Sequence, residues 1–127
     1  MKTCVVDTHA LIWYLDDDPR LGAGAAAVFD DASVRLIIPV IVMLEIRYLS
    51  YRGRFERTME EALQVIGLDP RCTIYPADLS VVNKAPLDLD IHDSLVVGTA
   101  LVQRELVDGV LTRDEAIVSS GLVPAVW

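Results

Sequence analysis

The chain has 127 residues, of which 53% are hydrophobic, so it is long and apolar enough for one domain with a substantial core. Its mean hydropathy of +0.40 is high, but its apolar runs are far shorter than the roughly 18 residues that cross a bilayer. The short runs exclude a membrane-spanning protein, and we expect a cytoplasmic one. Two cysteines exclude a disulfide framework, and the formal net charge of −8 is a caution against a nucleic-acid partner.

Short apolar runs alternate with helix-type segments, and no linker or repeat divides the chain. Strands are predicted at 2–6, 35–38, 72–75, 109–112 and 122–126. Helices are predicted near 9–16, 21–31, 40–52, 55–66, 78–84, 93–106 and 114–119. This alternation predicts an α/β fold, with a parallel sheet covered by helices on both faces. We expect residues 1–127 to form a single domain.

Four acidic residues occupy positions that this fold would bring together. Asp7 and Asp114 follow predicted strands, Asp93 begins a helix, and Glu45 lies in the apolar helix that starts after Pro39. Parallel α/β sheets bind ligands outside the carboxyl ends of their strands, where all four segments converge. The sequence therefore predicts one acidic site on this edge.

Each acid also has a purely structural interpretation. Asp93 is a natural helix N-cap, and Asp7 and Asp114 could be turn residues. Glu45 is the hardest to explain, because an ionised group in an apolar helix is costly unless it is paired or binds metal. With no Cys or His cluster beside them, oxygen ligands favour Mg²⁺, with Mn²⁺ as a substitute, over zinc.

A basic segment follows Glu45, with aromatic residues between its arginines. Such a segment suits phosphate contact and base stacking, and equally suits a solvated helix end or a contact with a partner protein. The candidate RNA-binding residues are Arg47, Arg52, Arg54 and Arg57. His9 and His92 are expected to be structural or capping residues.

Four segments of the chain resemble the motifs of PIN-domain nucleases, especially the VapC-type toxins of toxin–antitoxin pairs. In order, they are VVDTHALIWYL (5–15), VIVMLEIRYL (40–49), LDIHDSLVVGTAL (89–101) and GVLTRDEAI (109–117). One motif alone would be weak evidence, but four in the family's order and spacing are strong. In one departure, Ser94 stands where family members often carry Arg.

The resemblance implies a PIN-like α/β/α sandwich with a five-stranded parallel sheet in the order 3-2-1-4-5. It implies Mg²⁺-dependent hydrolysis of RNA phosphodiester bonds, with Asp7, Asp93 and Asp114 as metal ligands and Glu45 as a ligand or an acceptor for bound water. Residues expected to support these acids without binding the metal are Thr8, Thr112 and Asp90. It also implies a homodimer and a cognate antitoxin protein that blocks the acidic site.

Three other interpretations remain open. A non-catalytic interaction module on the same fold would not need all four acids. An aspartyl phosphotransfer enzyme would use Asp7 as its nucleophile, but usually needs a second acid two residues on, where this chain has His9. Cleavage of DNA in place of RNA is disfavoured only by the habit of the family.

Overall fold

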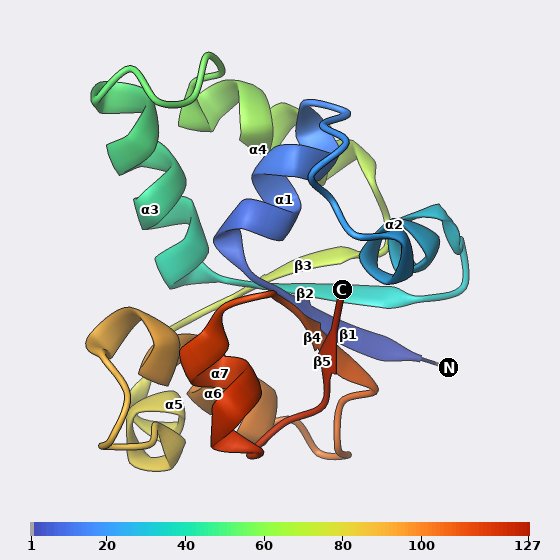
Figure 1. The fold of residues 1–127 in the computed structure, drawn as a ribbon. Helices are drawn as coiled ribbons and strands as arrows, with labels where there is room; N and C mark the ends of the chain where they lie inside the picture. The colour runs from blue at the N-terminus through green and yellow to red at the C-terminus, as the bar shows by residue number, and fades with distance from the viewer. Residues whose placement is uncertain (1) are drawn as a thin grey trace.

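The computed structural model describes residues 2–127 and contains one five-stranded, all-parallel sheet (Figure 1). The strands are β1 (Thr3–Val6), β2 (Arg35–Pro39), β3 (Cys72–Tyr75), β4 (Gly109–Leu111) and β5 (Ala125–Val126). Their order is β3-β2-β1-β4-β5, so the predicted fold class and strand order are confirmed.

The central strands are apolar throughout because helices cover both of their faces. Val5, Val6, Ile37 and Val110 are completely buried, as expected for strands inside a parallel sheet. β1 pairs with both β2 and β4, which are its neighbours on either side. The winding of the sheet reverses between β1 and β4, and this switch point is where open α/β sheets bind ligands.

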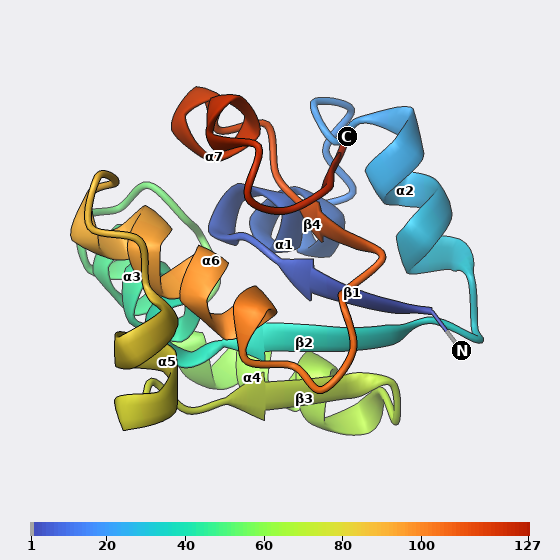
Figure 2. The same ribbon diagram turned by 90° about the horizontal axis from the view of Figure 1, so that it is seen from below.

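Within residues 2–127, seven helices cover the sheet in two layers. They are α1 (Thr8–Leu15), α2 (Ala23–Asp30), α3 (Val40–Tyr51), α4 (Met59–Leu68), α5 (Leu79–Lys84), α6 (Ile91–Leu101) and α7 (Glu115–Ser120). The first four lie on one face of the sheet and the last three on the other (Figures 1 and 2). Gly98 allows α5 to pack closely on α6, because a Cβ atom there would lie 2.8 Å from the Val81 carbonyl oxygen. Across residues 2–127, no helix is long and apolar enough to cross a membrane.

Two helix starts differ from the prediction. α6 begins at Ile91, and its N-cap is Asp90, whose side chain accepts a hydrogen bond from the Asp93 backbone N–H. The prediction of Asp93 as the N-cap is therefore wrong, because the acid three residues earlier already fills that role. α4 begins at Met59, later than predicted, because Thr58 caps it and the preceding segment is a loop that buries Phe55.

Candidate active site

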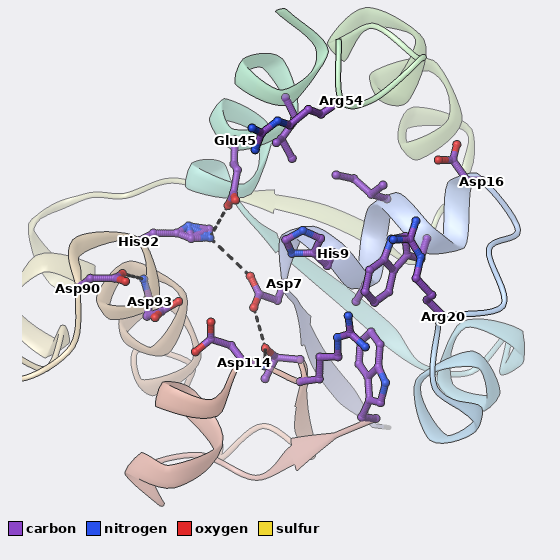
Figure 3. Close-up of a pocket in the computed structure, with 17 residues that line it drawn as sticks. Asp7, His9, Asp16, Arg20, Glu45, Arg54, Asp90, His92, Asp93 and Asp114 are labelled. Atoms are coloured by element: carbon purple, nitrogen blue, oxygen red, sulfur yellow. Dashed lines mark hydrogen bonds and ion pairs between the residues drawn. The ribbon is translucent and has the colours of Figure 1, made fainter. Parts of the chain in front are cut away.

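The four predicted acids line one pocket of about 670 Å³ at the carboxyl edge of the sheet (Figure 3). Asp7 directly follows β1 and Asp114 follows β4, on the two sides of the switch point. Glu45 reaches the pocket from the middle of α3 and Asp93 from the first turn of α6. Residues far apart in sequence are thus brought together by strand order and by the helices that leave this edge.

Asp7 is held through both of its carboxylate oxygens. Oδ1 accepts the Thr8 backbone N–H at 2.8 Å, and Oδ2 accepts the Thr112 hydroxyl at 2.7 Å. Burial raises the pKa of Asp7, and the nearby Glu45 adds to this, while hydrogen bonds from Thr112 and Thr8 and the proximity of His92 oppose it. The carboxyl group is therefore fixed in direction, and its burial makes it harder to ionise.

Glu45 uses only one of its oxygens for contacts within residues 2–127. Its Oε2 accepts the Thr8 hydroxyl at 2.8 Å and lies 2.7 Å from Nε2 of His92. The same His92 nitrogen is 3.6 Å from Oδ1 of Asp7, so the imidazole bridges two of the acids (Figure 3). Oε1 is left without a hydrogen-bond partner among the described residues.

Asp93 is buried, at 7% exposure, and no group within residues 2–127 donates a hydrogen bond to its carboxylate. Burial and the negative charges of Asp114, Asp90 and Asp7 raise its pKa to about 6, against a reference of 3.8. Since Asp90 caps the helix, helix capping no longer explains Asp93. Ser94 does not replace the missing arginine, because its hydroxyl donates to the Pro86 and Leu89 carbonyls.

The two carboxylate oxygens of Asp114 differ: one caps a helix, and the other is available to bind a ligand. Its Oδ1 accepts the backbone N–H groups of Ala116 and Ile117, which caps α7. The Asp114 backbone N–H in turn donates to the Thr112 hydroxyl at 3.1 Å, which ties this acid to Asp7 through one threonine. Only Oδ2 is left for a ligand.

A model of the PIN domain family matches residues 4–119, which is most of the chain. The chain belongs to the PIN domain family. PIN domains are generally nucleases that use divalent metal ions, so the resemblance found in the sequence is confirmed at the level of the family.

The fold of this PIN domain is also similar to a solved structure, VapBC2 from Rickettsia felis bound to a DNA fragment from their promoter. The TM-score is 0.69, with 97% of this chain and 96% of that chain covered, at 12% sequence identity. At so low an identity the likeness supports the fold alone. No curated protein sequence matches the chain.

The donor set of this PIN domain fits a divalent cation in its chemistry. Within residues 2–127 no three His, Cys, Asp or Glu side chains are close enough together to hold a metal ion as they stand. Nevertheless, carboxylates of Asp7, Asp93 and Asp114 line one pocket, and His92 is the only basic group paired with a member of the acidic set in that part of the chain. Burial, followed by the neighbouring carboxylates, raises the pKa values of Asp7 and Asp93, and a bound cation would oppose both effects.

The four arginines predicted to bind RNA lie in different places. Arg54 lines the acidic pocket, and Arg52 lines an adjoining apolar groove beside Tyr48. Arg57 donates to the Leu15 carbonyl at the end of α1, and its Nε lies 3.6 Å from Asp16. Arg47 is exposed and lines neither of these two cavities.

Three functional candidates were missed from the sequence. His92 was interpreted as structural, yet it contacts Glu45 and Asp7; its place beside Asp93 in the third motif was the available signal. Arg113 and Arg20 also line the acidic pocket. Arg113 is next to Asp114 in the fourth motif, whereas nothing in the local sequence marks Arg20.

Thr112 offers a direct test of how Asp7 is supported. Thr112→Val keeps the shape of this buried side chain but removes the hydroxyl that stabilises the charged form of Asp7. We expect the affinity for a divalent ion to fall by about 10–100-fold, as is typical when a group supporting a metal ligand is lost. Titration calorimetry with Mn²⁺ measures this, and Thr112→Ser, which keeps the hydroxyl, should bind nearly as well as the wild type. Equal affinity in the valine variant would contradict the role.

The raised pKa values predict an unusual pH dependence in metal-free protein. A carboxyl group whose folded pKa lies above its unfolded value binds protons more tightly when folded, so stability rises as the pH falls through that range. For Asp93, with a pKa of about 6 against 3.8, and for Asp7, the free energy of unfolding in EDTA should increase as the pH falls from 7 to about 4.5. Below that, protonation of Asp69, whose pKa is lowered by Arg71, reverses the trend.

Urea denaturation across this pH range measures the effect. Asp93→Asn should remove much of the increase, because the variant has no proton to bind at this position. If the stability of the wild type falls steadily from pH 7 to 4.5, the pKa values of Asp7 and Asp93 are not raised in the folded protein.

Proposed function

We propose that this PIN domain, residues 1–127, is a Mg²⁺-dependent ribonuclease and the toxin of a VapBC-type toxin–antitoxin pair. The observation that carries the proposal is the convergence of Asp7, Glu45, Asp93 and Asp114 on one pocket at the sheet's switch point. Membership of a family of nucleases supports the activity. The similar fold of a protein solved as a VapBC complex supports the biological role.

In this proposal Asp7, Asp93 and Asp114 hold the cation. When bound, a divalent ion supplies Lewis-acid chemistry, favouring ionisation of water and offsetting the negative charge that develops at the phosphorus. Asp7 is the fixed member, because Thr8 and Thr112 orient its two oxygens. Asp93 contributes a buried carboxylate that accepts no hydrogen bond from the described residues, and Asp114 contributes Oδ2 alone because Oδ1 caps α7.

Glu45 is proposed to accept a hydrogen bond, and then the proton, from the attacking water at Oε1. Its other oxygen is occupied by Thr8 and His92, which fixes the direction of the carboxylate. His92 therefore acts as a positioning residue for Glu45, and its ring lies between Glu45 and Asp7. This gives Glu45 a role that differs from that of the three ligands.

The proposed partners are an RNA substrate, a cognate antitoxin that covers the acidic pocket, and a second copy of the chain in a homodimer. An RNA substrate would place the protein in the cytoplasm. Co-expression with the protein encoded next to it, followed by purification through a tag on the toxin alone, would test for a tight antitoxin.

The activity is tested by incubating the purified protein with single-stranded RNA and with single-stranded DNA of the same sequence, in Mg²⁺, Mn²⁺ or EDTA. We expect cleavage of RNA that depends on either metal and stops in EDTA. Cleavage that persists in EDTA would overturn the proposed chemistry. Cleavage of DNA alone would change the substrate, and no cleavage of either would favour the non-catalytic interaction module.

A further inference from the structure

Arg113 occupies an unusual position in the pocket, between two residues of the acidic site but turned away from it. Thr112 supports Asp7 and Asp114 lines the pocket, yet the guanidinium of Arg113 lies over the indole of Trp13, 4.4 Å from the ring centroid. It lies 5.8 Å from the ring centroid of Trp127. The pocket that contains the four acids is also lined by Arg113 and both tryptophans.

The aromatic rings form a fixed platform for this guanidinium. Trp13 is buried at 5% exposure in α1, and its ring packs edge-on against Trp127 with centroids 5.6 Å apart. Trp127 packs closely against the start of α2. The packing is tight enough that a Cβ atom added at Gly22 would lie 2.5 Å from Trp127. When a guanidinium stacks on an indole ring, the ring covers one of its faces. Its N–H groups lie in the guanidinium plane, at its edges, where they can donate to an oxygen ligand.

Arg113 differs from Arg20, the other arginine over Trp13, in its lack of a carboxylate partner. Within residues 2–127 no Asp or Glu forms an ion pair with it, although acids line the same pocket. In contrast, Arg20 is bound by Asp18 at 2.8 Å. Arg113 is therefore a positioned, uncompensated positive charge in a pocket that otherwise carries excess negative charge.

Asp93 and Asp114 lie on a different side of the cavity from Arg20. Figure 3 places Asp90, Asp93 and Asp114 toward one side and Arg20 toward the other, with Asp7 between them. Arg20 contacts the same Trp13 ring as Arg113, at 4.7 Å from its centroid, which locates the Arg113 guanidinium on the Arg20 side. An RNA strand that is cleaved at the acidic site would extend along the pocket toward Arg20 and Arg113.

We propose that Arg113, stacked on Trp13, binds a backbone phosphate of single-stranded RNA next to the phosphodiester bond that is cleaved at the acids. The inference rests on the proposed ribonuclease function. It adds a residue that positions the RNA and the side of the pocket along which the RNA extends. It also explains how a chain of net charge −8 holds a polyanion. A planar guanidinium matches phosphate geometry, and one local contact matters more for placement than the average charge.

The test compares Arg113→Ala, Arg113→Lys and Arg35→Ala with the protein that carries none of these three substitutions. Arg35 is exposed at the start of β2, on the opposite edge of the sheet, so its variant removes the same charge far from the pocket. Binding of a fluorescent single-stranded RNA of about 12 nucleotides is followed by anisotropy in Mg²⁺, in an Asp93→Asn background that blocks cleavage. A DNA strand of the same sequence provides a second probe.

We expect Arg113→Ala to weaken RNA binding about tenfold, as for loss of one charged hydrogen-bonded contact. The slope of log K against log salt should fall by about 0.7, which corresponds to one phosphate of a single strand. Arg113→Lys should recover part of the affinity, and Arg35→Ala should match the wild type. In the active protein, Arg113→Ala should raise KM about tenfold and change kcat little.

Three outcomes separate the possible failures. If Arg113→Ala lowers the melting temperature but leaves KM and the salt slope unchanged, the arginine serves only to pack Trp13 and Trp127, and the inference is overturned. If the wild type binds and cleaves RNA while the Arg113 variants behave like Arg35→Ala, the inference fails and the proposed function stands. If the wild type neither binds nor cleaves RNA, both fail together.

Discussion

Replacing Asp7 by asparagine is expected to lower metal-dependent cleavage of RNA by more than about 100-fold, since even groups that only support metal ligands contribute 10–100-fold. The asparagine side chain would retain one oxygen for hydrogen bonding but would lack the charge that attracts the cation. The stability of the folded protein should not decrease. Because burial raises the pKa of Asp7, a neutral residue there removes an electrostatic penalty, and the melting temperature in EDTA should be unchanged or higher.

Asp16→Asn is the matched control. Asp16 lines the same pocket as Asp7 but lies at the end of α1, near Arg57, away from the other acids. We expect it to retain at least half of the wild-type rate. Full activity in Asp7→Asn would show that Asp7 has no catalytic role. Equal losses in both variants would show that the pocket's general negative charge matters and that Asp7 has no special role.

Adding a divalent ion at neutral pH is expected to stabilise the protein strongly. A ligand that binds only the folded state contributes about 2.7 kcal/mol at a hundredfold excess over its Kd, which for a chain of this size corresponds to a rise in melting temperature of roughly 10 °C. The gain has a clear physical source here, because the cation offsets repulsion among Asp7, Asp93 and Asp114 that the apo protein cannot relieve. Differential scanning fluorimetry with Mg²⁺ or Mn²⁺, against EDTA, measures it.

The pH dependence of this stabilisation provides its control. Binding requires the carboxylates to lose their protons, so the shift should shrink below about pH 6, where Asp93 becomes protonated. Asp93→Asn should show little shift at any pH. An equal rise in the wild type and in Asp93→Asn would mean that the ion binds elsewhere or acts only as a salt.

The sequence by itself determined the class of the fold and the membership of the acidic set. Continuous apolar runs such as 35–38 and 109–112 are typical of strands buried on both faces, and their alternation with helices requires parallel crossovers. Glu45 was identifiable because a lone carboxylate in an apolar helix has no cheap structural explanation. These signals are local, and they depend on burial costs that apply before the exact fold is known.

Only the tertiary structure decided how the acids differ and what surrounds them. The capping of α6 by Asp90 freed Asp93 from a structural role, and the hydroxyl of Thr112 joined Asp7 to Asp114. His92 and Arg113 gained their positions from contacts with residues distant in sequence, namely Glu45 and Trp13. Side-chain direction depends on how packed helices fix each rotamer, and no periodicity in one sequence encodes that.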